Sequence, residues 1–115
     1  MTRSAAREIT SFSKKEINLL FKHAKSVIRK QGLDIRLAPK AQKLAKILLI
    51  VPRKAGNSPE RNLLKRRLKS IFYEERWFQK EFDWIIVARK EAIDIPFSGL
   101  RSLLQEAYQA TQSTN

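Results

Sequence analysis

One segment with an apolar side and a cationic side, residues 53–69, constrains the fold of this chain more than any other feature. It contains seven Lys and Arg residues and one acid, Glu60. At about 100° per residue, the apolar positions of the predicted helix fall on one arc: Leu64, Leu68, Ile71 and Phe72. Such a helix must pack its apolar arc against other elements and leave its cationic side in solvent.

Capping signals place this long helix and its neighbours. Ser58 is the predicted N-cap, Pro59 occupies the first helical position, and the helix is expected to continue to about Phe78. Ser13 caps a first helix over residues 14–28. The β-branched pair at the end of that range also fits a short strand, so its last residues stay open between the two.

Three strands and a last helix complete the pattern. Alternating apolar residues after Gly32 predict a strand over 33–38. The run 46–51 is apolar on both faces and predicts a central strand, and 82–88 predicts another. Pro96 and Ser98 open a final helix. Its core stripe is predicted to be Leu100, Leu103, Leu104, Ala107 and Tyr108.

The predicted fold class is therefore α+β, a single sheet with packed helices. The order is helix, two or three strands, long basic helix, strand, helix. A chain of 115 residues suffices for one domain, which we place at 11–110. A flexible basic arm over 1–10 and a frayed tail over 111–115 flank it.

The charge indicates the class of partner. The chain has 24 Lys and Arg against 11 Asp and Glu, a net charge of +13. A folded domain with this excess usually binds a polyanion, and nucleic acid is the commonest one. A solvated helix face is the alternative for the basic segment, but it would normally carry acids among its bases, and none lies between Arg61 and Tyr73.

Several classes of function are excluded or disfavoured. The absence of cysteine excludes disulfides, thiolate metal sites and a cysteine nucleophile. No signal peptide is evident, and the apolar run 47–52 is too short to cross a bilayer, so we expect a cytoplasmic protein without a membrane partner. The single His23 is expected to be a surface or packing residue rather than a catalytic base.

Residues 51–69 resemble the signature of the bacterial ribonuclease P protein family. That signature has two basic residues, Gly-Asn, and then Arg-Asn-Arg followed by an apolar residue and Lys-Arg. Residues 21–26 and 84–90 resemble the family's first helix and last strand, in the same order. This chain departs from the pattern at four positions: Leu63 replaces the third residue of Arg-Asn-Arg, Ile17 and Ile35 replace usual aromatic residues, and Ala24 replaces a glycine.

The resemblance implies a protein subunit that assists a catalytic RNA. This RNA removes the 5′ leader from precursor tRNA by Mg²⁺-dependent hydrolysis, with Mg²⁺ bound mainly by the RNA and the substrate. It implies no catalytic or metal-binding residue in the protein, one monomer per ribonucleoprotein, and a left-handed βαβ crossover around the basic helix, as in a class of ribosomal protein domains. The implied RNA-binding residues are Arg53, Lys54, Arg61, Asn62, Lys65, Arg66, Arg67 and Lys69. The implied leader-binding cleft is lined by Ile17, Phe21, Ile35, Arg89 and Lys90.

Three other functions are compatible with parts of the sequence. A ribosomal or other structural RNA-binding protein would share the size, the charge and the lack of catalytic residues. An autonomous nuclease would need a carboxylate cluster, and the acids Asp34, Asp83, Glu91 and Asp94 are too scattered to suggest one. DNA recognition by the basic helix in a major groove is a more distant option.

Overall fold

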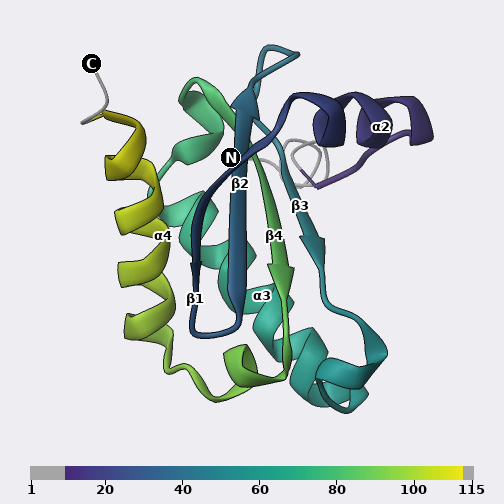
Figure 1. The fold of residues 1–115 in the computed structure, drawn as a ribbon. Helices are drawn as coiled ribbons and strands as arrows, with labels where there is room; N and C mark the ends of the chain where they lie inside the picture. Colours follow the sequence, from purple (N-terminus) through teal and green to yellow (C-terminus); the bar gives the residue numbers. More distant parts are fainter. Residues whose placement is uncertain (1–9, 113–115) are drawn as a thin grey trace.

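The fold is one sheet with helices on both faces, and the computed structural model describes residues 10–112. The helices and strands follow in the order α2 (Lys14–His23), β1 (Lys25–Lys30), β2 (Leu33–Pro39), β3 (Ile47–Ile50), α3 (Ser58–Glu74), β4 (Phe82–Ala88) and α4 (Phe97–Gln112). Short 3₁₀ turns occupy Arg53–Ala55, Trp77–Gln79 and Lys90–Asp94. This arrangement confirms the predicted α+β class and the order of elements (Figure 1).

The sheet has the strand order β1-β2-β4-β3. β1 and β4 pair antiparallel with β2, whereas β3 pairs parallel with β4. In Figure 1, β3 and β4 run downward with β3 on the right, and α3 lies behind them, so the β3–α3–β4 crossover is left-handed. This is the uncommon hand for such a connection.

β3 lies at the edge of the sheet, so the prediction of a central strand over 46–51 was wrong. Its two faces are nevertheless both covered. Ile47 and Leu49 contact the apolar cluster beneath α3, and Leu48 and Ile50 contact a smaller cluster beneath α2. Apolar residues on both faces of a strand therefore indicate that other elements cover both faces. They do not indicate that both edges of the strand are paired.

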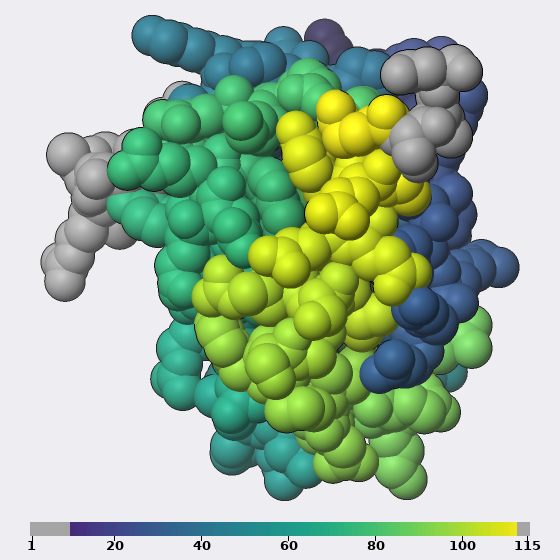
Figure 2. Space-filling model, turned by 90° about the vertical axis from the view of Figure 1, so that its left-hand side faces the viewer, coloured from purple at the N-terminus to yellow at the C-terminus, as the bar shows by residue number. Residues whose placement is uncertain are grey.

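The larger apolar cluster lies between the sheet and helices α3 and α4. Its centre is Trp84, which stacks on Trp77 at 4.8 Å and meets the edge of Phe72. The predicted stripe of α4 faces this cluster, with Tyr108 partly buried beside it. Figure 2 shows α4 lying across this side of the molecule, between the blue β1–β2 segment and the teal-to-green α3 segment.

The first helix ends earlier than predicted. α2 stops at His23, and Ala24 is already extended at φ −76° and ψ 139°. The strand alternative for the end of the 14–28 segment is correct, because β1 pairs with β2 and buries Ile28 in the larger cluster.

Two other boundaries of the helices also differ. Asn57, not Ser58, caps α3, and the helix stops at Glu74, before Arg76, which has a left-handed φ of 56°. α4 continues to Gln112, two residues into the predicted frayed tail. Positions 1–9 of the predicted arm and 113–115 of the tail lie outside the described residues.

Candidate nucleic-acid interface

The side of α3 that faces away from the sheet, together with the turn before it, forms a cationic face. We use this name for Arg53, Lys54, Asn62, Lys65, Arg66, Arg67 and Lys69, all of them exposed or half-buried. Within residues 10–112, none of these cations forms an ion pair. Lys65, Arg66 and Lys69 line a shallow depression with Asn62 and Tyr73, so cationic groups and one aromatic ring share a single surface.

The opposite side of α3 anchors this face. Leu64, Leu68, Ile71 and Phe72 are at most 3% exposed and pack on the sheet, as the helical periodicity predicted. The cations are therefore displayed on a helix whose rotation and position are fixed by the core. Because the helix is already held in place, its backbone does not have to be ordered when the cations contact phosphates. The regular spacing of the cations along the helix suits a polyanion whose phosphates are regularly spaced.

Hydrogen bonds fix the N-terminal end of α3. The Asn57 side chain accepts a hydrogen bond from the Glu60 backbone N–H at 2.9 Å, and the Glu60 carboxylate accepts one from the Asn57 N–H. A Cβ atom at Gly56 would lie only 2.8 Å from this carboxylate, so a side chain at position 56 would displace the Glu60 carboxylate from its capping position. The Gly-Asn pair thus leaves room for the cap that begins α3, directly after the turn that carries Arg53 and Lys54.

Arg61 differs from the other predicted RNA-binding residues. Its guanidinium donates to the Gly56 carbonyl at 3.1 Å and to the Ser58 hydroxyl at 3.1 Å. Arg61 therefore holds the turn at the start of α3, and only the remaining N–H groups of its guanidinium point to solvent.

A second polar surface lies on the sheet face that α2 partly covers. Asp34 on β2 accepts hydrogen bonds from Arg36 at 3.0 and 3.2 Å and from the Ser26 hydroxyl at 2.9 Å, and Arg29 lies 3.5 Å away. Partial burial opposes ionisation of Asp34, but the bonds from Arg36 and Ser26 outweigh it and lower its pKa. The carboxylate thus remains ionised and orients two guanidinium groups.

The predicted leader-binding residues fall into two groups. Ile17 is half-buried and Phe21 is 38% exposed, both on α2. Arg89 and Lys90 are exposed after β4, and Arg89 lines a hollow with Arg29 and Asp34 near the β1–β2 turn. These four residues and the Asp34 cluster lie on or beside the same sheet face.

Ile35 does not belong to this surface. It is 0% exposed and points into the larger cluster beneath α3 and α4, on the other side of the sheet. The predicted role of Ile35 in a leader cleft is therefore wrong. Because side chains alternate along a strand, the open face is occupied by its neighbours Asp34 and Arg36.

The family model for ribonuclease P matches residues 9–112, which is nearly the whole chain. The chain belongs to the ribonuclease P protein component family. The ribonuclease P protein component of Bacillus velezensis is 33% identical over 92 residues, covering 80% of this chain and 79% of the relative. That of Streptococcus gordonii is 32% identical over 85 residues, covering 74% and 71%.

Solved ribonuclease P proteins share the fold. The structure from Staphylococcus aureus aligns with a TM-score of 0.76 at 18% identity, covering 93% of this chain and 98% of the other. The structure from Thermotoga maritima aligns with a TM-score of 0.71 at 24% identity, covering 87% and 96%. The left-handed crossover thus belongs to a fold found in this family.

Sequence reasoning on this ribonuclease P family member missed Arg29 and Arg36. The signal for Arg36 was present, because alternation from Leu33 to Leu37 places Asp34 and Arg36 on the face away from the core. Arg29 could not be found in this way, because it follows the 14–28 segment, whose end the sequence left open between a helix and a strand. Pairing of β1 with β2 is what brings it beside Asp34.

The chemistry available to this member of the family is ionic binding. Among residues 10–112, no group of three His, Asp or Glu side chains could hold a metal ion. No helix in the same part of the chain is long and apolar enough to span a membrane. The described surfaces offer cations, amides and a few exposed rings, which are the groups that contact phosphates and bases.

Proposed function

We propose that this chain is the protein subunit of a ribonuclease P whose catalyst is RNA. It binds that RNA through the cationic face of α3 and binds the 5′ leader of precursor tRNA along the sheet face that carries Arg29 and Arg36. One observation carries the proposal above all: six cations without an intramolecular ion pair in the described residues gather on and just before one anchored helix.

The physical role of the cationic face is charge screening. Two RNA molecules must approach closely at the cleavage site, and each phosphate that a Lys or Arg contacts releases condensed counterions and favours association. Mg²⁺ supplies the hydrolytic chemistry, and we assign it mainly to the RNA and the substrate, because no carboxylate cluster forms in residues 10–112. The protein then lowers the bulk Mg²⁺ that the RNA needs.

The leader contacts follow from the second surface. A single-stranded leader exposes both phosphates and bases, which match the Arg29 and Arg36 guanidiniums and the exposed Phe21 ring respectively. Because Asp34 holds Arg36 in place, little conformational entropy is lost when a phosphate binds. We infer one protein monomer per RNA, acting in the cytoplasm.

Reconstitution tests the proposal. The purified protein alone should not cleave precursor tRNA, and with the cognate catalytic RNA it should lower the Mg²⁺ concentration required for leader removal. A triple variant, Lys65→Gln, Arg66→Gln and Lys69→Gln, should lose this effect, whereas the exposed Lys80→Gln should retain it.

Two results would contradict the proposal. Cleavage by RNA-free protein that a single carboxylate substitution abolishes would indicate an autonomous nuclease. RNA binding without any effect on leader removal would instead indicate a ribosomal or other structural RNA-binding protein.

A further inference from the structure

A pocket lies on the side of α2 away from Ile17 and Phe21, between this helix and the segment that joins β2 to β3. Its walls are mainly apolar: Phe12, Leu19, Leu20, Ala38, Pro39 and Leu44. Leu19 is 45% exposed, an unusual degree for a large apolar side chain in this protein, and it forms the outer lip of the pocket. The pocket is therefore separate from the leader surface described above.

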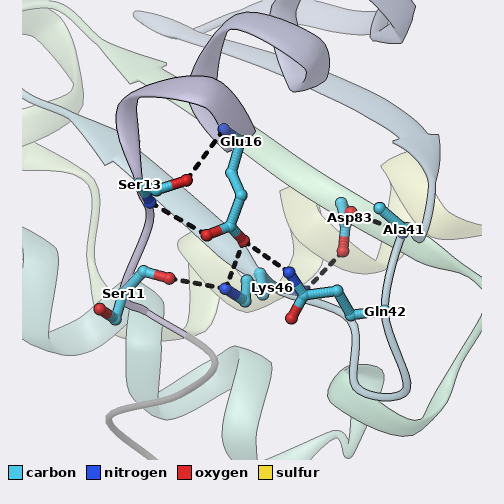
Figure 3. Close-up of polar contacts among 7 residues, drawn as sticks. All are labelled: Ser11, Ser13, Glu16, Ala41, Gln42, Lys46 and Asp83. Atoms are coloured by element: carbon cyan, nitrogen blue, oxygen red, sulfur yellow. Dashed lines mark hydrogen bonds and ion pairs between the residues drawn. The ribbon is translucent and has the colours of Figure 1, made fainter.

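One wall of the pocket is built from a fixed polar network (Figure 3). Lys46 Nζ lies 2.6 Å from Glu16 Oε2 and donates to the Ser11 carbonyl at 2.8 Å, and Gln42 donates to the same Glu16 oxygen at 2.8 Å. The Asp83 carboxylate accepts from the backbone N–H of Lys46 at 2.7 Å. Burial raises the pKa of Asp83, although the backbone N–H bonds oppose the shift. These contacts fix the positions of Glu16, Gln42 and Lys46 along this wall.

The charge around the pocket is one-sided. Two of the segments that form it, residues 10–24 and 39–46, contain six lysines and a single acid, while β4 adds the buried Asp83 to the pocket wall. That acid, Glu16, is already neutralised by the buried Lys46. Four more lysines on these segments, Lys15, Lys22, Lys40 and Lys43, are exposed, lie outside the pocket wall itself and form no ion pair within the described residues, whereas Lys14 lies on the Ile17 and Phe21 side of α2.

An apolar pocket with cations around it matches one chemistry closely. In a single-stranded nucleic acid, each apolar base face is flanked by phosphates, so the base fits the pocket while the phosphates meet the lysines. Gln42 adds a polar group at the mouth, because its side-chain oxygen accepts no hydrogen bond within residues 10–112 and can meet a base edge. An apolar peptide or an acyl chain would leave Lys15, Lys22, Lys40 and Lys43 unmatched.

We propose that this pocket binds the base of one unpaired RNA nucleotide, whose neighbouring phosphates contact the surrounding lysines. The inference rests on the proposed function, since it requires an RNA partner. The nucleotide belongs either to the catalytic RNA or to precursor tRNA. The shared chemistry is a base without a pairing partner, and the experiment below separates the two sources.

Photo-cross-linking locates the nucleotide. The full chain with the photoreactive residue benzoylphenylalanine at position 19 is irradiated with the catalytic RNA alone, with precursor tRNA alone, and with both. We expect a cross-link to one unpaired nucleotide in one of the two RNAs. The same residue at position 18, an exposed neighbour outside the pocket, is the matched control. Equal cross-linking from positions 18 and 19 would overturn the proposal.

Affinity measurements with two kinds of variant provide an independent test. Leu19→Gln keeps the charge and removes part of the apolar wall, so affinity for the cross-linked RNA should fall about five- to ten-fold with an unchanged salt dependence. Asn18→Gln should have no effect. Lys15→Gln and Lys43→Gln should instead flatten the log–log salt slope by about 0.7 each.

The failure of this proposal is distinguishable from failure of the proposed function. If wild-type protein binds neither RNA, the proposed function fails. If wild type binds and the Lys65, Arg66 and Lys69 variant binds weakly, but Leu19→Gln binds like wild type, the pocket proposal alone is overturned.

Discussion

Lys46 Nζ lies 2.6 Å from Glu16 Oε2, and this pair joins the first turn of α2 to the residue just before β3. The Lys46 side chain is only 9% exposed, and its ammonium also lies 5.2 Å from the centre of the Phe12 ring. Leu20 is the buried residue of α2, so apolar packing alone anchors this helix weakly. The ion pair therefore contributes substantially to where α2 sits.

The pair predicts a specific loss of stability in acid. The hydrogen bond from Lys46 is the main cause that lowers the pKa of Glu16 from 4.5 to about 2. A carboxyl whose pKa is lower in the folded state stabilises the fold above its unfolded pKa, and this contribution is lost as pH falls from about 4.5 towards 2. The difference in urea midpoint between wild type and Glu16→Gln should thus be large at pH 7 and shrink steadily below pH 4.5.

An exposed ion pair supplies the control for this pH measurement. Glu106 lies 2.8 Å from Lys30, and both side chains are about half exposed. Because exposed ion pairs contribute little to the free energy of folding, Glu106→Gln should change the urea midpoint only slightly, both at pH 7 and at pH 2.5. A wild-type to Glu16→Gln difference that stays constant from pH 7 to pH 2.5 would contradict the assigned role of the Glu16–Lys46 pair.

The second prediction concerns Arg36 and the leader. Arg36→Gln should weaken binding of precursor tRNA with a leader about ten-fold, because a hydrogen bond to a charged group contributes about 1.5 kcal/mol or more. Binding of mature tRNA, which lacks the leader, should not change. Lys80→Gln is the control, since Lys80 is exposed and does not line the hollow of Arg29, Asp34 and Arg89. Equal losses for precursor and mature tRNA would argue against a leader contact.

The third prediction concerns the cationic face as a whole. Affinity for the catalytic RNA should fall steeply with salt, and each of Lys65→Gln, Arg66→Gln and Lys69→Gln should reduce the log–log slope by about 0.7 to 0.9. Lys80→Gln, an exposed substitution after α3, should leave the slope unchanged. A wild-type slope near zero would exclude the cationic face as the RNA interface.

The fourth prediction concerns Leu63 and Arg67, which lie one turn apart on α3. Both are half-buried, and Leu63 lies outside both apolar clusters of the described residues. We expect Arg67 to supply the charge that Leu63 lacks relative to the family signature. Leu63→Arg should leave folding nearly unchanged and tighten RNA binding slightly, while Arg67→Ala weakens it.

A double-mutant cycle on RNA affinity tests this relationship. In the Leu63→Arg background, Arg67→Ala should cost less than in wild type, because the new guanidinium replaces the lost one. Additive effects of the two substitutions, or a marked fall in Tm from Leu63→Arg alone, would show that Arg67 does not supply the charge that is missing at position 63.

The fifth prediction separates Ile35 from the leader surface. Ile35→Ala should lower the free energy of unfolding by about 3 kcal/mol, because a fully buried side chain is truncated beneath α3 and α4. At temperatures where the variant remains folded, its preference for precursor over mature tRNA should equal that of wild type. A selective loss of leader binding would show that Ile35 does contribute to the leader surface.

Local periodicity was sufficient for part of the fold. The strand over 82–88 and the buried stripe of α4 follow from alternation and helical spacing, which depend only on neighbours in sequence. The anchored side of α3 follows in the same way. The cationic side of this helix could be predicted as well, because an excess of like charge must lie in solvent.

Non-local pairing decided what local patterns could not. Val27 and Ile28 are compatible with a helix until β2 lies beside them, and β3 looks central until its outer edge is seen to lack a partner among the described residues. The Asp34–Arg36 pair required knowing which sheet face the helices leave open. The pocket beside Leu19 joins segments about twenty residues apart, so no sequence motif marks it.

The insertion of β4 between β2 and β3 has a consequence for synthesis of the chain. Until residues 82–88 leave the ribosome, β2 and β3 have no shared neighbour, and the apolar β3 has no pairing partner. The nascent chain must therefore hold the residues before Phe82 in an incomplete state, with many of its positive charges exposed beside ribosomal RNA. Folding of this protein is expected to be cooperative, and fragments that end before Phe82 should not form the sheet.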